Sequence, residues 1–514
     1  MKRLLLILLS AITLFSCIAC KPGGGQNGGN VNLNDEPIHP ENQPAYTEAI
    51  EVSSLKRTES GKKYLEVNGR PFLMLGVQLR TDLFMQLDGL TLDDLDYLFK
   101  LVDSVNVTCV QIPICWRDIE PRKNQYTNHY VEKYIEYCNK YNIKLELLWF
   151  GSYMCGYSVE GYIPSYVVED LETYPAYSNN SFNGWLGKHY FLRPSTKALI
   201  EREKKAIEFM MEGIWEYDRM HGGRRTVIGI QIENEPDMLA TRHNNDHGYS
   251  NEQIWPDLAV MLDELGQSVK NSKYKCYTRV NLVTDGNYES RAEDLVNSEG
   301  IDFAGIDPYD GTVNGIKQYV NSLDFGENFS HIAENGGEFE NTNQLELQAF
   351  KQGAGYEVFE IITTDNPQLV DWTLRGLYNP DKTKKAHTDS VIIANQMYKR
   401  AYVDIVLADS INFLAFNLIS NGAMKELVQT NDTDSVTVKF KTTTGGVAFA
   451  IERDGYLTVA SSSNDTMEFS GANLGEVEEG AYSLMGEWKK MSSESLKNGV
   501  LTMKAGCVYR IKIN

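Results

Sequence analysis

The sequence predicts an α/β protein, a (β/α)8 barrel of the TIM type followed by a C-terminal all-β sandwich. Eight short runs rich in apolar and β-branched residues alternate with helical patterns, as parallel βαβ units do. No GxGxxG or GxxxxGKS/T motif follows any of these runs, which argues against an open nucleotide-binding sheet. From about residue 409 the helical patterns stop, and short alternating strands separated by turn residues take over.

The eight barrel strands are expected where apolar runs of strand length occur. These runs are Phe72–Gln78, Thr108–Ile114, Lys144–Phe150, Val227–Glu233, Cys276–Val283, Phe303–Asp307, His331–Ala333 and Tyr356–Ile362. Between them, Thr91 and Asp94 form a capping box, after which Leu95, Leu98 and Val102 repeat at helical spacing. Further helices are expected at Asn128–Tyr141, Thr196–His221, Asn251–Asn271, Thr342–Gly353 and Ser390–Leu407.

Changes in composition divide the chain into four expected parts. They are a lipoprotein signal peptide at residues 1–16, a flexible tether at 17–50, a catalytic barrel at 51–409 and a β-sandwich accessory domain at 410–514. The sandwich is expected to pack against the barrel, with glycan binding as the alternative. The long insertion between the third strand and the third helix, Gly151–Pro194, is expected at the mouth of the barrel.

The N-terminus has the features of an export signal. Lys2 and Arg3 precede an apolar run, Leu4–Phe15, that is too short to span a bilayer. The following segment, Leu14–Cys17, resembles a bacterial lipobox, in which the cysteine is lipidated after cleavage. Cys20 is a second candidate, and plain secretion is a third possibility. We therefore expect a protein that is lipid-anchored at the cell envelope, in the outer membrane and either periplasmic or surface-exposed.

Charge and cysteine content exclude some classes of function. The 70 acidic residues exceed the 49 basic ones and give a net charge of −21, which disfavours binding to nucleic acids. The cysteines beyond residue 20 form no CxxC pair and the histidines no cluster, so neither a metal nor another cofactor is expected.

Two glutamates follow apolar strands where catalytic groups of barrels lie. Asn234 and Glu235 end the fourth strand before Pro236, and Glu334 ends the seventh strand before a pair of glycines. Because the two strands are three positions apart in a closed barrel, the two carboxylates can face each other across the axis. Hydrolysis of a glycosidic bond needs such a pair, one as proton donor and one as nucleophile or base.

These motifs carry a resemblance to known enzymes. The segments Ile232–Pro236 and Ala333–Gly337 resemble the clan of retaining (β/α)8 glycoside hydrolases in which an Asn-Glu pair carries the acid/base. The segment Ile112–Pro121 is similar to the second-strand region of the family 35 and 42 β-galactosidases, and Leu148–Pro164 is similar to a bacterial branch close to family 35. The third strand lacks the Glu-Asn-Gly run that holds galactose in family 35.

The resemblance implies roles for individual residues. It makes Glu235 the acid/base, Glu334 the nucleophile and Asn234 the contact to the sugar 2-hydroxyl. Glu233, alternatively part of an internal ion pair, and Glu338 are lesser candidates for acid and nucleophile. Further expected substrate-binding residues are Tyr309, which would hydrogen-bond the nucleophile, Arg80, which would hold a sugar hydroxyl or the nucleophile, and a stacking wall of Trp116, Trp149 and Trp372.

Two interpretations remain open at this stage. In the first, the protein is a retaining glycosidase, most simply an exo-acting β-galactosidase on plant or algal polysaccharide fragments, with an endo-acting β-glycanase as a variant. In the second, it is a catalytically silent surface lipoprotein that binds glycans. The presence of both strand-end glutamates favours the first, because a binding protein has no need to keep both.

The lipobox leads to a direct test. Replacing Cys17 with alanine should release the protein from the membrane fraction, because the acyl chains attached there are the expected anchor. Fractionation followed by immunoblotting measures the release, and Cys20→Ala, which should stay membrane-bound, is the control. Release by Cys20→Ala alone would place the lipidation site three residues further on.

Overall fold

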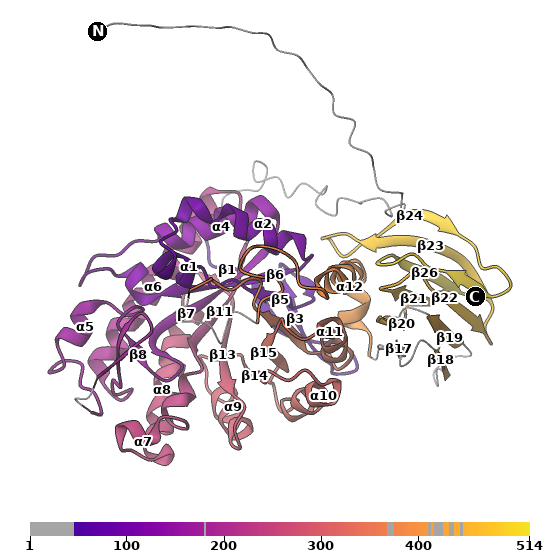
Figure 1. Ribbon diagram of the computed structural model, residues 1–514. Helices are drawn as coiled ribbons and strands as arrows, with labels where there is room; N and C mark the ends of the chain where they lie inside the picture. The colour runs from indigo at the N-terminus through magenta and orange to yellow at the C-terminus, as the bar shows by residue number, and fades with distance from the viewer. Residues whose placement is uncertain are drawn as a thin grey trace, which may run out of the picture. The chain divides into compact units, whose positions relative to one another are not determined.

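The computed structural model describes residues 46–178, 181–366, 375–409, 413–415, 425–430, 436–442 and 446–514. It confirms the predicted barrel, in which eight parallel strands close on themselves (Figure 1). In chain order these are β5 (Leu75–Gln78), β6 (Cys109–Cys115), β7 (Lys144–Met154), β11 (Val227–Asn234), β13 (Tyr277–Val283), β14 (Phe303–Asp307), β15 (His331–Gly336) and β16 (Gly355–Phe359). All of their residues with the exception of Lys144 are buried, as expected for strands covered on both faces.

Helices follow the strands and form the outer layer. The larger ones are α2 (Asp96–Ser104), α4 (His129–Tyr141), α6 (Lys197–Met220), α8 (Asn251–Lys270), α9 (Tyr288–Val296), α10 (Val313–Ser322), α11 (Thr342–Lys351) and α12 (Thr388–Arg400). Short helices complete the loops: α1 (Thr81–Leu87), η2 (Leu92–Leu95), α3 (Trp116–Ile119), α5 (Ser165–Glu169), η3 (Pro236–Leu239), α7 (Asn244–His247) and α13 (Tyr402–Leu407).

Three small sheets in the described residues were not expected from the sequence. Before the barrel, β2 (Ser53–Arg57), β3 (Lys63–Val67) and β4 (Arg70–Phe72) form an antiparallel sheet. A two-stranded sheet pairs β1 (Ile50–Glu51) with β12 (Tyr274–Lys275). Within the long insertion after β7, the strands β8 (Ser158–Val159), β9 (Phe182–Gly184) and β10 (Gly187–Tyr190) form the third sheet. Strands of two to five residues carry too little periodic pattern to be recognised in a sequence.

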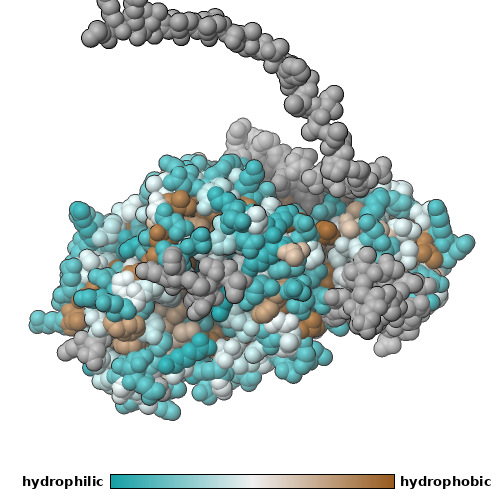
Figure 2. Space-filling view, viewed as in Figure 1, coloured by the Kyte–Doolittle hydropathy of each residue, from teal (hydrophilic) through white to brown (hydrophobic). Residues whose placement is uncertain are grey.

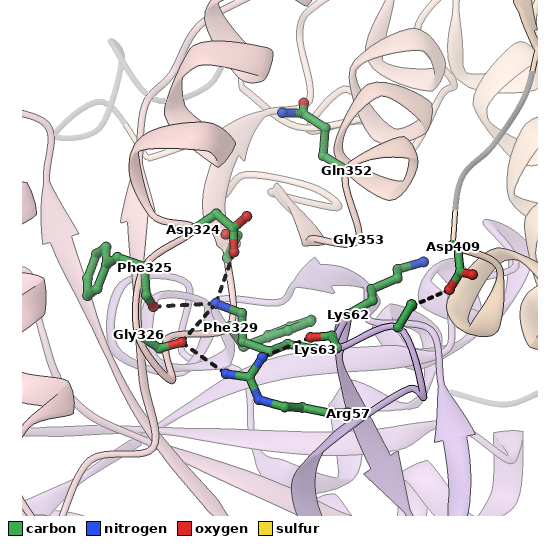
Figure 3. A pocket seen from close by; sticks show the side chains of 13 residues that line it. Arg57, Lys62, Lys63, Asp324, Phe325, Gly326, Phe329, Gln352, Gly353 and Asp409 are labelled. Carbon is green, nitrogen blue, oxygen red and sulfur yellow. Dashed lines mark hydrogen bonds and ion pairs between the residues drawn. The ribbon is translucent and has the colours of Figure 1, made fainter.

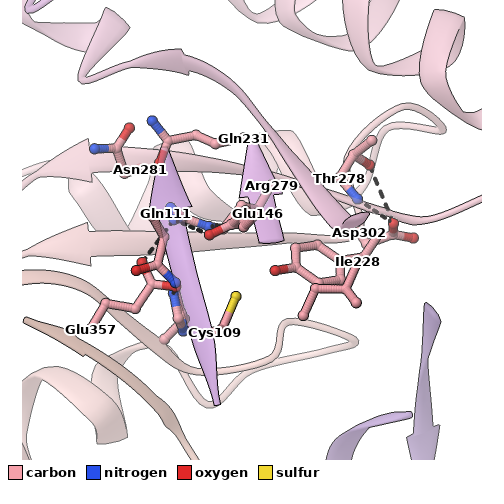
Figure 4. Close-up of polar contacts among 12 residues, drawn as sticks. Cys109, Gln111, Glu146, Ile228, Gln231, Thr278, Arg279, Asn281, Asp302 and Glu357 are labelled. Atoms are coloured by element: carbon pink, nitrogen blue, oxygen red, sulfur yellow. Dashed lines mark hydrogen bonds and ion pairs between the residues drawn. The ribbon is translucent and has the colours of Figure 1, made fainter. Parts of the chain in front are cut away.

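The barrel interior holds a buried charge cluster (Figure 4). Arg279 donates to both carboxyl oxygens of Glu146, at 2.6 and 2.8 Å, and to Glu357 at 2.9 Å. Gln111 donates to the other oxygen of Glu357 at 2.7 Å. Burial raises the pKa of both glutamates to about 7, and the positive charge of Arg279 opposes that shift. The arginine thus keeps two carboxylates compatible with a water-free interior.

After the barrel, two antiparallel sheets enclose a separate apolar core. One contains β17 (Phe413–Ala415), β20 (Ala448–Arg453), β21 (Tyr456–Ser461), β23 (Leu474–Tyr482), β24 (Trp488–Glu494) and β26 (Val508–Ile513), and the other contains β18 (Lys425–Thr430), β19 (Thr437–Thr442), β22 (Thr466–Ser470) and β25 (Val500–Thr502). Asp404 of α13 is buried and accepts hydrogen bonds from Arg453, Thr458 and Tyr482 of the first sheet, at 2.7–2.8 Å. This carboxylate joins the sandwich to the last helix of the barrel.

The face of the molecule seen in Figure 2 is mostly hydrophilic, with small scattered hydrophobic groups. Among the described residues, none of the helices combines the length and apolar character needed to cross a membrane.

Loss of the central arginine should destabilise the barrel. Replacing Arg279 with methionine leaves Glu146 and Glu357 buried without their cation, which should lower the free energy of unfolding by about 3–5 kcal/mol. Urea unfolding followed by circular dichroism measures the loss. Lys273→Met, which removes an exposed pair with Glu212, is the matched control and should change stability by less than about 1 kcal/mol. Equal effects of the two substitutions would contradict the structural role of the cluster.

Candidate active site

The carboxyl ends of the barrel strands bring the two predicted glutamates into one site. Glu334 lies within β15, and Glu235 comes directly after β11. Their charges interact strongly enough for Glu334 to raise the pKa of Glu235. Both are almost buried, with 5% and 8% of their surface exposed, so each carboxyl group is controlled mainly by its protein neighbours.

Glu334 is held as a hydrogen-bond acceptor. The hydroxyl of Tyr309, which follows β14, donates to Oε2, and the amide of Gln78, at the end of β5, donates to Oε1 at 3.1 Å. The guanidinium of Arg375 lies over the Tyr309 ring, 4.1 Å from its centre. Two donors directed at the two oxygens fix the orientation of the carboxyl group.

Glu235 has the opposite environment. Its backbone N–H donates to Oδ1 of Asn281 at 3.0 Å, and its Oε2 accepts a weak hydrogen bond from the thiol of Cys155 at 3.4 Å. Burial, followed by the negative charges of Glu334 and Asp237, raises the pKa of Glu235 to about 8. Glu235 is therefore protonated at neutral pH and can donate a proton.

Asn234 lies between the two sides of the site in a network of amides. Its Oδ1 accepts from Gln231 and Asn281, both at 3.1 Å, and Asn281 also donates to Asp307 at 2.7 Å. The Asn234 amide nitrogen donates a weak hydrogen bond to the sulfur of Cys155 at 3.7 Å. With its oxygen held twice, this side chain presents its N–H group in a fixed direction.

The backbone at these strand ends adopts conformations that residues other than glycine rarely take. Glu233, Glu235 and Tyr309 have φ values of 60°, 44° and 45°. In addition, the pairing of β11 with β7 shifts register between Ile232 and Asn234. Strained backbone of this kind gathers at functional sites, where the surrounding structure must maintain it.

Glu233 is not part of the ion pair considered as its alternative role. Its carboxyl group accepts hydrogen bonds from the backbone N–H groups of residues 151–153 at 2.7–3.0 Å and contacts the carboxyl group of Glu203 on α6. Burial and the nearby Glu203 raise the pKa of Glu233 well above its usual value, and burial also raises the pKa of Glu203, so the two carboxyl groups share a proton. Glu203 also accepts from Trp149 at 2.7 Å and from Ser152 at 2.5 Å. This carboxyl pair anchors the end of β7 beside Glu235.

The other predicted substrate contacts have partners within the protein or lie outside the described residues. Trp116 and Trp149 have no exposed surface and donate to Glu120 and Glu203, so burial in the hydrophobic shell replaces the predicted stacking wall. Arg80 is also buried and pairs with Asp82 at 2.8 Å and with Tyr162 at 3.0 Å; no hydrogen bond between Arg80 and Glu334 is found. Trp372 lies outside the described residues, as does Cys17.

Three site residues were missed in the sequence. Gln78 and Asn281 are polar residues near the carboxyl ends of otherwise apolar strands, and strand alternation would have found them if it had been applied to every strand end. Cys155 follows β7 in the insertion, and no sequence pattern marks it, because its contact with Glu235 spans 80 residues.

No group of three or more potential metal ligands occurs in the part of the chain that the structure describes. A polar pocket of about 550 Å³ lies at the opposite end of the barrel, where loops enter β15 and β16 (Figure 3). Of its three basic side chains, Arg57 and Lys63 donate to the carbonyl of Gly326 and pair with Glu327 and Asp324, respectively. The third, Lys62, donates to the carbonyls of Ile405 and Ala408. The basic groups of this pocket are therefore engaged within the protein, and the pocket is distant in the fold from the strand-end carboxyl groups.

Comparisons with known proteins give relatives of the fold. Residues 258–423 match a family model described as a domain of unknown function, DUF4978. No curated protein sequence matches the chain. Similar solved structures include an exo-β-1,4-mannosidase from Opitutaceae bacterium strain TAV5 (14% identity, TM-score 0.47, covering 70% of this chain and 63% of that one).

Two further similar solved structures are also enzymes that act on glycosides, by their names. A family 39 glycoside hydrolase from the gut symbiont Bacteroides cellulosilyticus WH2 has 12% identity and a TM-score of 0.43, covering 88% of this chain and 84% of that one. A β-galactosidase from the psychrophilic Marinomonas ef1 has 12% identity and a TM-score of 0.48, covering 66% and 62%. At these identities and TM-scores, the similarities carry no argument about the reaction, which has to be argued from the site.

The buried carboxyl pair predicts a specific loss of stability. Glu203→Ala removes the acceptor for Trp149, Ser152 and the Glu233 proton, which should cost on the order of 3 kcal/mol. Glu203→Gln keeps one acceptor oxygen and should cost less. Urea unfolding measures both, with the exposed Glu201→Ala on the same helix as control. If Glu203→Ala were as stable as the control, the pair would not anchor this strand end.

Proposed function

We propose that the protein is a retaining β-glycosidase in which Glu334 is the nucleophile and Glu235 the acid/base. The observation that carries the proposal is the contrast between the two carboxyl groups of one site. Glu334 receives donors at both oxygens, whereas Glu235 is buried with its pKa raised to about 8. A glycosidase needs this combination of an ionised and a protonated carboxyl group.

The chemistry follows from this contrast. Glu334 attacks the anomeric carbon while the bond to the leaving oxygen breaks, and Glu235 gives its proton to that oxygen. Glu235, now ionised, then takes a proton from water, and the resulting hydroxide attacks the anomeric carbon and releases Glu334. Tyr309 and Gln78 keep Glu334 oriented through both steps, and we assign to the Asn234 N–H group the contact to the sugar 2-hydroxyl.

We further propose that the enzyme is an exo-acting β-galactosidase and that its substrates are plant or algal polysaccharide fragments. The support is the resemblance of residues 112–121 and 148–164 to the β-galactosidase group. The lipobox at Cys17 supports a position at the cell envelope, where such fragments would be met. A panel of nitrophenyl glycosides tests the sugar, and preferential hydrolysis of another β-glycoside would replace galactose while retaining the mechanism.

The two glutamates should fail in different ways when replaced. Glu334→Ala should abolish turnover, and external azide should restore it with inversion of the product, because azide enters the space of the missing nucleophile. Glu235→Ala should slow substrates with sugar leaving groups by about 10²–10⁴-fold but spare dinitrophenyl glycosides, which need little protonation. In the wild type, kcat/KM should fall as pH rises through about 8, since Glu235 then loses its proton. Initial rates and NMR of the product measure these effects, and an active Glu334→Ala enzyme without azide would overturn the assignment.

A further inference from the structure

The turn that carries Cys155 is held in place from several sides. The Cys155 N–H group donates to the carbonyl of Asn234 at 2.8 Å, and its own carbonyl accepts from Nε2 of His243 at 3.1 Å. Nδ1 of His243 in turn accepts from the hydroxyl of Tyr157 at 2.8 Å. Cys155 has a φ of 52°, and a Cβ atom at Gly156 would lie only 2.4 Å from the backbone nitrogen of Leu239. The turn is therefore clamped against the loop that follows Glu235.

The thiol of Cys155 is directed at the proton donor. Its sulfur lies 3.4 Å from Oε2 of Glu235. Among the described residues, no other side chain hydrogen-bonds this carboxyl group. Burial, followed by the charges of Glu235 and Glu334, raises the pKa of Cys155 well above its usual value. The group therefore stays a thiol and acts as a donor. Cysteine also has a single side-chain torsion before the sulfur, so a fixed backbone restricts the sulfur to a few positions.

We propose that Cys155 is a positioning residue for the acid/base, whose thiol holds one oxygen of Glu235 and leaves the other to face the leaving group. The inference rests on the proposed function. A thiol suits this task because it is a weak donor. A strong donor such as an arginine or a backbone amide would orient the carboxyl group equally well, but it would also stabilise the ionised form and weaken the acid.

Three substitutions separate hydrogen bonding from packing. Cys155→Val fills the space without a donor, Cys155→Ala removes both, and Cys155→Ser keeps a donor. The matched control is Cys115→Val. Cys115 is also a buried thiol, it packs in the same apolar cluster as Cys155, and its thiol interacts with Asp118 instead of Glu235. The readouts are kcat/KM for a disaccharide and for a dinitrophenyl glycoside, together with the pH profile.

With a disaccharide, Cys155→Val and Cys155→Ala should lower kcat/KM by about three- to tenfold, the worth of one hydrogen bond. The dinitrophenyl glycoside should be unaffected, and the alkaline limb of the pH profile should move to higher pH. Cys155→Ser should recover most of the loss. Equal losses on both substrates, or a Cys155→Val enzyme that matches the Cys115→Val control, would show that the thiol only packs and would overturn the inference.

A second measurement does not depend on activity. The infrared S–H stretching band of Cys155, isolated as the difference between wild type and Cys155→Ser, should shift when Glu235 is replaced by glutamine. An unshifted band would refute the contact itself. A wild-type protein that hydrolyses none of the glycosides would instead refute the proposed function, and the infrared result would still decide whether the thiol and Glu235 interact.

Discussion

The exclusion of water from carboxyl groups is the constraint on which the rest of this barrel depends. Parallel strands covered on both faces place every inward polar side chain in a medium where a lone charge is costly. Each buried acid must therefore gain a cation, accept hydrogen bonds, share a proton or remain protonated. The barrel uses all of these solutions, in its interior and at the ends of its strands.

In the barrel interior, the positive charge of Arg279 balances the carboxyl groups of Glu146 and Glu357 through direct hydrogen bonds. At the strand ends, Glu233 and Glu203 share a proton and receive the backbone N–H groups of residues 151–153. Beside them, Glu235 accepts only the weak hydrogen bond of the Cys155 thiol among the described residues, and the charge of Arg242 offsets only part of the rise of its pKa to about 8. Burial raises the pKa of the carboxyl groups at both places. Around Arg279 this rise is opposed by the cation, whereas at Glu235 it favours the protonated form.

This arrangement links the stability of the barrel to its chemistry. The Glu233–Glu203 pair anchors the end of β7, the turn after β7 carries Cys155, and Cys155 contacts Glu235. On the other side, Tyr309 and Gln78 hold Glu334 from two different strands. The carboxyl groups proposed as proton donor and nucleophile are thus oriented by separate sets of contacts.

The sequence by itself determined the order of the strands and helices, because burial on two faces imposes apolar runs and covering helices impose a 3.6-residue period. It also placed Asn234, Glu235 and Glu334 at strand ends, where a barrel gathers its polar groups. Only the tertiary structure decided which side chains meet these residues. Trp116 and Trp149 proved to be buried packing groups, and Arg80 is paired with Asp82. Gln78 and Cys155 entered the site through contacts across 256 and 80 residues of chain. Local pattern reports which residues are buried, whereas the partner of each buried polar group depends on contacts between distant segments that exist only once the barrel has closed.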